Sequence, residues 1–258
     1  MEKQQVKSAM RALEILEYFK LNQQRRSMSE IASDLGYPQS SATVLLKTLI
    51  TLGYLSYDRQ ERAYFPTPKV TALGEWIPMA LFGSGKILEA MRDVHTATGE
   101  GIFIGTKSDI YLQYTRTIAS IHALRFHIDE GSIVPLTRSA AGWMLLSSLP
   151  DHMLENLVRR ANIACEVPDR VTLAQAQDRV GEIRDKGYAR AVDIPLPGGA
   201  TIVVPLSVRI QGQPACLALG GVATRVTANF DRYLEALQAA AASVTSDEPF
   251  NTPIKIDF

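Results

Sequence analysis

The spacing of apolar residues predicts three helices at the start of the chain. Apolar residues recur at helical intervals from Ser8, again in 27-SMSEIASDLG-36, and again after Pro38. Ser27 and Glu30 have the separation of a capping box, which satisfies backbone N–H groups at a helix start. The third helix should bury one stripe of side chains: Ala42, Leu45, Leu46, Leu49 and Leu52.

A β-hairpin should follow these helices. The runs 54-YLSY-57 and 63-AYF-65 flank the polar turn DRQER, as two short strands flank a hairpin loop. Only Gly36, Tyr37 and Pro38 separate the second and third helices. Three helices and then a hairpin is the order of a winged helix-turn-helix. We therefore predict a winged helix-turn-helix DNA-binding domain over residues 1–67.

The remaining chain predicts a linker and a second domain. Thr67-Pro68 opens a helical segment, a linker helix over 68–83 that Pro78 should kink or end. Strands then occur in two groups around helices, which favours an antiparallel α+β domain over 84–245, followed by a C-terminal tail over 246–258. The expected strands are GIFIGT, IYLQYTR, HALRFHI, YARAVDI, ATIVVPLSV and PACLALGGV, and the expected helices span about 84–98, 138–161, 172–187 and 228–243.

Composition supports a folded two-domain protein. The chain has 258 residues, of which 46% are hydrophobic and 21% charged. Residues 1–66 hold nine Lys and Arg against seven Asp and Glu, while the rest hold eighteen against twenty, an asymmetry that permits polyanion binding without demanding it. No apolar run reaches the roughly 18–20 residues of a membrane span. We expect no membrane association and a cytoplasmic location.

The sequence offers little that could catalyse a reaction. The four histidines and two cysteines lack metal-ligand spacing, and no nucleophile–base arrangement can be named. The string 83-GSGK-86 lacks the first glycine of a phosphate-binding loop. We expect no cofactor, no metal and no enzymatic activity.

The third helix instead presents side chains suited to reading DNA. Gln can bond an adenine edge at two points, and Ser and Thr can meet bases or phosphates. Basic residues on the first helix, before the second helix and at the hairpin tip occupy positions that meet phosphates when such a helix lies in a major groove. The predicted DNA-binding residues are Arg11, Arg25, Arg26, Gln39, Ser40, Ser41, Thr43, Lys47, Arg59 and Arg62.

Two alternatives remain open at this stage. The winged helix could serve protein contacts, in which case no DNA binding is expected even at low salt. The second domain could process a metabolite, with the winged helix as a tether. The lack of a catalytic arrangement speaks against the second alternative, and the placement of basic residues speaks against the first.

The sequence resembles the IclR-type (isocitrate lyase regulator) family of bacterial transcription factors over residues of about 6–245. Each matching stretch is short, but their order and spacing together are specific. They are 11-RALEIL-16, 29-SEIASDLGYPQSS-41, 52-LGYL-55, 68-PKVTALG-74, 135-PLTRSAAGWMLLSSLP-150, 182-EIRDKGYA-189 and 202-IVVPLSVRIQGQPACLALGG-221.

The resemblance implies a ligand-responsive repressor or activator, often of a catabolic operon. It implies a GAF-like effector domain, a homodimer or tetramer, double-stranded operator DNA as partner, and a small organic effector. Residues carried over to the effector site are Ala140, Ala141, Gly142, Thr201, Ala218 and Gly220. Such a small lining, poor in hydrogen-bond donors, favours a mostly apolar ligand, such as an aromatic acid or its ester, held by Thr201 and backbone N–H groups.

Overall fold

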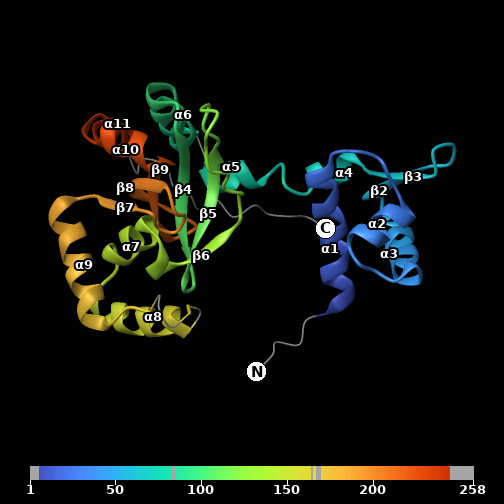
Figure 1. Cartoon of the computed structure of the whole chain (residues 1–258), viewed down its shortest axis with the longest axis horizontal. Helices are drawn as coiled ribbons and strands as arrows, with labels where there is room; N and C mark the ends of the chain where they lie inside the picture. The colour runs from blue at the N-terminus through green and yellow to red at the C-terminus, as the bar shows by residue number, and fades with distance from the viewer. Residues whose placement is uncertain (1–5, 83–84, 164, 167–169, 245–258) are drawn as a thin grey trace. The chain divides into compact units, whose positions relative to one another are not determined.

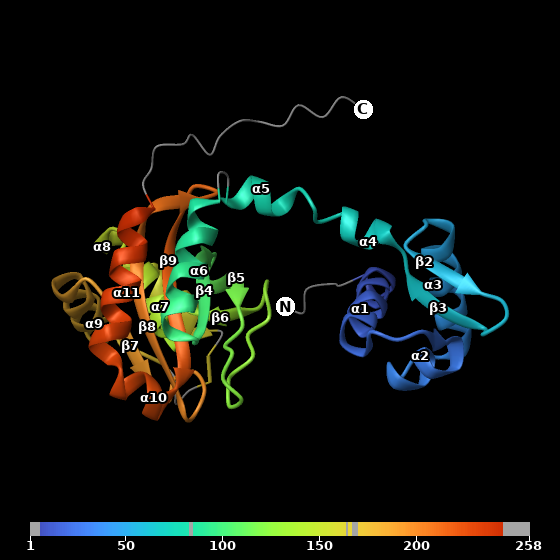
Figure 2. The same cartoon turned by 90° about the horizontal axis from the view of Figure 1, so that it is seen from above.

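The chain divides into two compact units. The structure, a computed structural model, describes residues 6–82, 85–163, 165–166 and 170–244. One unit ends at Pro78 and the other begins at Met79. Figures 1 and 2 show the two units, each of which is described by itself below.

The first unit is a winged helix-turn-helix, as predicted. Its helices are α1 (Lys7–Asn22), α2 (Met28–Asp34) and α3 (Gln39–Thr51). The hairpin strands β2 (Leu55–Asp58) and β3 (Ala63–Pro66) pair antiparallel, and the sequence did not predict the short third strand β1 (Arg26–Ser27), which pairs with β3. The unit is centred on buried side chains from all three helices and β2: Ile15, Phe19, Ile31, Leu46, Leu49 and Leu55.

Local chemistry sets the ends of these helices. The predicted capping box is present: Glu30 N donates to Ser27 Oγ at 3.3 Å, and Ser27 N donates to Glu30 Oε2 at 2.8 Å. Gly36 follows α2 with φ +66°, the left-handed conformation that glycine adopts without strain. The buried stripe of α3 ends one turn earlier than predicted, because the side chain of Leu52 is 51% exposed.

The segment predicted as one linker helix contains two short helices. They are α4 (Pro68–Ala72) and α5 (Ile77–Phe82), separated by a turn. Thr67 Oγ1 accepts the N–H of Lys69 at 3.3 Å and so caps α4. Pro78 is the second residue of α5, where its missing N–H costs no helical hydrogen bond. The break therefore precedes Pro78.

The second unit contains one fully antiparallel six-stranded sheet in the order β6-β5-β4-β9-β8-β7. This confirms the predicted antiparallel α+β class. The strands are β4 (Gly101–Ser108), β5 (Tyr111–Ile118), β6 (Ile133–Pro135), β7 (Ala189–Val192), β8 (Gly199–Ile210) and β9 (Gln213–Val222).

Helices cover both faces of this sheet (Figure 1). On one face, α6 (Lys86–Thr98), α10 (Ala223–Ala228) and α11 (Phe230–Ser243) pack on residues such as Ile104 and Ile202. On the other face, α7 (Ala140–Ser147), α8 (Asp151–Ile163) and α9 (Leu173–Lys186) pack on residues such as Phe103 and Val203. Neighbouring residues of one strand thus belong to different cores, as the period of a β-strand requires.

One predicted strand is wrong. The segment 122-HALRFHI-128 has no regular secondary structure, and the third strand of the first group is instead β6, which is only three residues long. Phe126 and Ile128 of this segment instead lie on the wall of a pocket. Apolar residues at every second position indicate that one side of a segment is buried. They do not show that the segment pairs with another strand.

Candidate DNA-binding face and effector pocket

The recognition helix α3 is fixed by its apolar side and leaves its polar side exposed. Ala42, Leu46 and Leu49 are buried, while Gln39, Ser40, Val44 and Lys47 are exposed. Ser41 and Thr43 are half-buried, and Thr43 Oγ1 donates to Gln39 O at 2.8 Å. The predicted base-reading side chains thus lie on the solvent side of α3.

Arg25 is engaged inside the unit. Its Nη1 donates to Asp58 Oδ2 at 2.9 Å and to Glu61 Oε2 at 2.7 Å. Asp58 Oδ1 accepts the N–H groups of Gln60 and Glu61 at 2.8 and 3.1 Å. These backbone hydrogen bonds, and then Arg25, hold the pKa of the Asp58 carboxyl below its usual value. Arg25 is therefore paired with carboxylates of the wing, and its predicted contact with a phosphate stays a prediction.

Two further predicted DNA contacts have partners within the unit. Arg26 forms an i, i+4 ion pair with Glu30 at 3.2 Å, and the guanidinium of Arg11 lies 4.9 Å from the centre of the Tyr37 ring. In contrast, the structure records no side-chain partner for Lys47, Arg59 or Arg62 among the residues it describes. These three exposed cations are the best placed to meet phosphates.

Arg62 occupies an unfavourable backbone conformation at the wing tip. Its φ is +52°, in the left-handed region that glycine tolerates and most other residues avoid. A strained residue of this kind often serves function at the expense of stability. We expect Arg62→Gly to raise the free energy of unfolding by up to about 1 kcal/mol and to weaken DNA binding.

Urea unfolding and fluorescence anisotropy on a labelled duplex measure the two effects of Arg62→Gly separately. Arg62→Ala is the matched control, because it removes the same charge while the unfavourable φ remains. Arg62→Gly binding DNA as tightly as the wild type would contradict the proposed phosphate contact.

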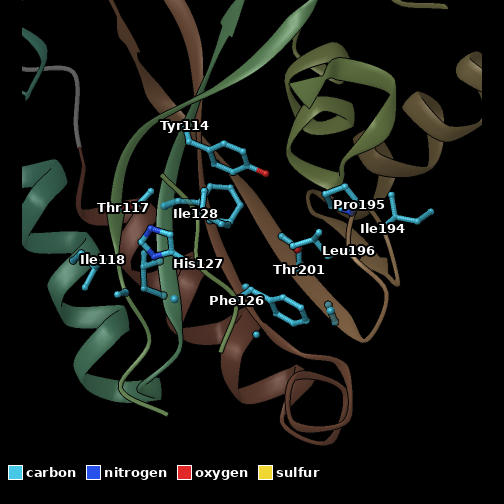
Figure 3. A pocket seen from close by; sticks show the side chains of 18 residues that line it. Tyr114, Thr117, Ile118, Phe126, His127, Ile128, Ile194, Pro195, Leu196 and Thr201 are labelled. Carbon is cyan, nitrogen blue, oxygen red and sulfur yellow. The ribbon is translucent and has the colours of Figure 1, made fainter. Parts of the chain in front are cut away.

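The second unit contains an apolar pocket under a loop. We call residues 119–131 the strap. One end is fixed to Gly99 O, which accepts Ser120 Oγ at 2.9 Å and Ile121 N at 3.0 Å. At the other end Gly131 N donates to Tyr114 O at 2.7 Å. The middle of the strap, with Phe126 and Ile128, forms one wall of the pocket (Figure 3).

The strap pocket has a cavity volume of about 100 Å³ and eighteen lining residues. Its floor is formed by glycines at the ends of β4, β8 and β9, and its walls by aromatic and aliphatic side chains. Figure 3 shows the side chains of Tyr114 and Thr201 among those that line the pocket. The main lining residues are Gly101, Phe103, Tyr114, Thr117, Phe126, His127, Ile128, Ile194, Leu196, Thr201, Gly220 and Gly221.

Only part of the predicted effector site lies in this pocket. Thr201 and Gly220 line it as neighbours on paired strands. Ala140 lines a separate hollow of about 440 Å³ beside α9 and β7. Ala141 and Ala218 are buried in the core between the sheet and α7, and Gly142 is buried where α7 approaches Leu136.

Sequence reasoning missed most of the pocket walls. Phe126 and Ile128 lie on the strap, and Ile194 and Leu196 lie on the loop before β8. The apolar residues Ile194 and Leu196 beside the prolines of 194-IPLPGG-199 were an available signal, because binding residues often lie on loops.

A buried ion pair lies directly behind the pocket floor. The Glu100 side chain is fully buried and accepts Arg225 Nη2 at 2.9 Å and also Arg225 Nε. A Cβ added to the floor residue Gly221 would lie 2.3 Å from Glu100 Oε2. Hydrogen bonding to Glu100 raises the pKa of Arg225, so the guanidinium stays charged. The pair stabilises the position of the floor.

Within the described part of the chain, no group of three His, Cys, Asp or Glu side chains could hold a metal ion. Among the same residues, no helix is both long enough and apolar enough to cross a membrane.

Comparison with known proteins identifies both units. Residues 8–59 match the IclR helix-turn-helix domain, and residues 71–246 match the bacterial transcriptional regulator IclR C-terminal domain. The HTH-type transcriptional regulators XynR and KdgR of Escherichia coli (strain K12) are 23% and 24% identical to this chain. The XynR alignment covers 93% of this chain and 96% of XynR, and the KdgR alignment covers 86% and 88%.

Solved structures agree with this assignment. The effector domain of the transcriptional regulator IclR from Acinetobacter sp. ADP1 is 46% identical, with a TM-score of 0.61, covering 66% of this chain and 99% of that domain. The Thermotoga maritima IclR structure shares the fold, with 22% identity, a TM-score of 0.75, and coverage of 92% and 96%. The chain belongs to the IclR family of bacterial transcriptional regulators, so it is a ligand-responsive DNA-binding regulator and not an enzyme.

Proposed function

We propose that the protein regulates a catabolic operon by sensing a small, largely apolar metabolite in the strap pocket. The observation that carries this proposal is an apolar cavity whose walls are aromatic and whose polar groups are few and neutral. The larger hollow beside α9 is a weaker candidate, because its charged residues, including Arg179 and Lys186, are exposed to water.

The effector would act by favouring one conformation of the effector domain over another. A ligand can shift such an equilibrium only by its difference in affinity for the two states. The strap supplies a segment that ligand contacts would order, and Arg225 Nη2 reaches the strap at Leu124 O, 3.4 Å away. Helix α10 carries Arg225 and leads into α11, which packs on α6 in the same core.

A screen of melting temperatures tests the sensing proposal. We expect single-ring aromatic compounds to raise the melting temperature more than aliphatic acids of similar size, and a stabilising compound to change the affinity for DNA. Stabilisation by aliphatic acids alone would contradict the apolar effector.

We propose that operator DNA binds across α3 and the wing, with the protein assembled as a homodimer or tetramer in the cytoplasm. The polar side of α3 and the unpaired cations Lys47, Arg59 and Arg62 support the DNA interface. Apolar side chains exposed at helical spacing at the start of α1 support assembly: Val6, Met10 and Leu13 are 67%, 40% and 64% exposed.

The salt dependence of DNA binding distinguishes basic side chains that contact phosphates from basic side chains that pair with carboxylates of the protein. We expect Lys47→Ala to reduce the slope of log affinity against log salt by about one, because one phosphate contact is lost. Arg25→Ala is the matched control, since Arg25 is already paired with Asp58 and Glu61 and should leave that slope nearly unchanged. Equal changes in both variants would contradict this division of roles.

A further inference from the structure

We propose that the strap pocket binds an uncharged ring compound with a carbonyl or similar acceptor group, and that it discriminates against the corresponding carboxylate. This inference rests on the proposed role of the pocket as the effector site. The sequence left open whether the effector is an aromatic acid or a neutral derivative such as an ester, and the lining of the pocket favours the neutral derivative.

The pocket contains no cation that could neutralise a carboxylate. None of its eighteen lining residues is Lys, Arg, Asp or Glu. His127 is the single imidazole among them, but its side chain is 77% exposed and its Nε2 lies 3.3 Å from Asp129 Oδ1. The ring therefore already lies beside a carboxylate, at the exposed rim of the pocket.

The ion pair behind the floor provides no free positive charge either. Arg225 uses Nε and Nη2 on the two oxygens of Glu100. The Glu100 carboxylate lies beside Gly221, where it would obstruct an added Cβ. Because the pair is neutral overall, it offers a ligand carboxylate no counter-charge, and burying an unpaired carboxylate against an apolar wall is expensive.

Neutral hydrogen-bond donors are present instead. The hydroxyls of Tyr114 and Thr201 have no protein partner among the described residues, and both residues line the pocket. Burial raises the pKa of Tyr114 to about 12, so its hydroxyl keeps the proton that it would donate. The carbonyl oxygen of an ester or an amide is an acceptor that either hydroxyl can donate to.

The size of the pocket limits the ligand to one ring. An engineered apolar cavity of about 150 Å³ holds benzene. The strap pocket is smaller, at about 100 Å³, so a single ring would fill it and extend into its open mouth. Phe103 and Tyr114, whose ring centres are 4.9 Å apart, supply an aromatic wall for such a ring.

Methyl benzoate and sodium benzoate are matched probes that differ mainly in charge. Titration calorimetry at pH 7.5 on the full chain should show the ester binding at least tenfold more tightly than the anion. Tyr114→Phe and Thr201→Val should each weaken the ester roughly five- to tenfold, because each removes one donor while keeping the side-chain shape. Unliganded melting temperatures check that each variant is folded.

Gly220→Ala distinguishes failure of this inference from failure of the proposed site. The added Cβ would lie 3.7 Å from Phe103 and 3.9 Å from Thr201 Oγ1, so it fits the fold but occupies the pocket. If benzoate binds as tightly as the ester and Gly220→Ala weakens both, the site stands and the charge discrimination is overturned. If neither probe binds at millimolar concentration, or if Gly220→Ala changes nothing, the ring-binding pocket itself is overturned.

Discussion

Gly142→Ala is expected to destabilise the effector domain strongly. A Cβ at this position would lie 2.0 Å from Leu136 O and 2.7 Å from Leu136 Cα. These are backbone atoms of a fully buried residue, so no side-chain rotation relieves the clash. Inserting a methylene into a packed core costs about 1–3 kcal/mol even where side chains can move, and a backbone collision should exceed that range. Urea unfolding of purified protein measures the loss.

Gly181→Ala is the matched control for this prediction. Gly181 lies inside α9, and a Cβ there would meet nothing within 4 Å. Alanine should raise the free energy of unfolding by about 0.5–1 kcal/mol through helix propensity. If Gly142→Ala unfolds at the same urea concentration as the wild type, the close approach of α7 to Leu136 is wrong.

Arg225→Met should destabilise the effector domain by about 3–5 kcal/mol at neutral pH. The substitution leaves the Glu100 carboxylate fully buried without its charged partner, and breaking a buried pair from one side carries a cost of this size. Tyr233 Oη, 3.4 Å from Glu100 Oε1, and His122 Nε2, 3.8 Å from the same oxygen, are more distant than Arg225 and compensate less. Chemical denaturation followed by circular dichroism measures the change.

The double variant Glu100→Met with Arg225→Met separates charge burial from packing. Replacing both members of a buried pair by apolar residues of similar volume is often neutral or stabilising. We therefore expect the double variant to be more stable than Arg225→Met alone. A double variant less stable than either single variant would show that the methionines disturb packing and that the pair is not the source of the loss.

The DNA-binding domain was largely predictable because its signals are local. The capping box of Ser27 and Glu30 and the apolar stripe of α3 depend on residues a few positions apart. The role of Arg25 was not predictable in this way. Its partners Asp58 and Glu61 lie 33 and 36 positions away, and only the pairing of the strands brings them together.

The six positions carried over from the resemblance do not come together in one place. Thr201 and Gly220 line the strap pocket as neighbours, since their strands pair across the sheet. Gly142 is small because the backbone of Leu136 lies against it, and Ala218 is buried in the core between the sheet and α7. Small residues in a sequence do not show whether the space beside them is empty or filled. The sequence did not predict that the strap lines the pocket, because a loop that pairs with no strand has no sequence pattern from which its position can be inferred.

Binding of operator DNA by the exposed side of α3 tests the central claim most directly. The measurement is the affinity of the full chain, by fluorescence anisotropy at fixed salt, for a duplex selected from a random library and for its scrambled form. The wild type should prefer the selected duplex by at least about 10³-fold, and Gln39→Ala should lose about 1–3 kcal/mol on that duplex and little on the scrambled one. Equal affinity of the wild type for both duplexes, or an equal loss on both in Gln39→Ala, would contradict base reading by α3.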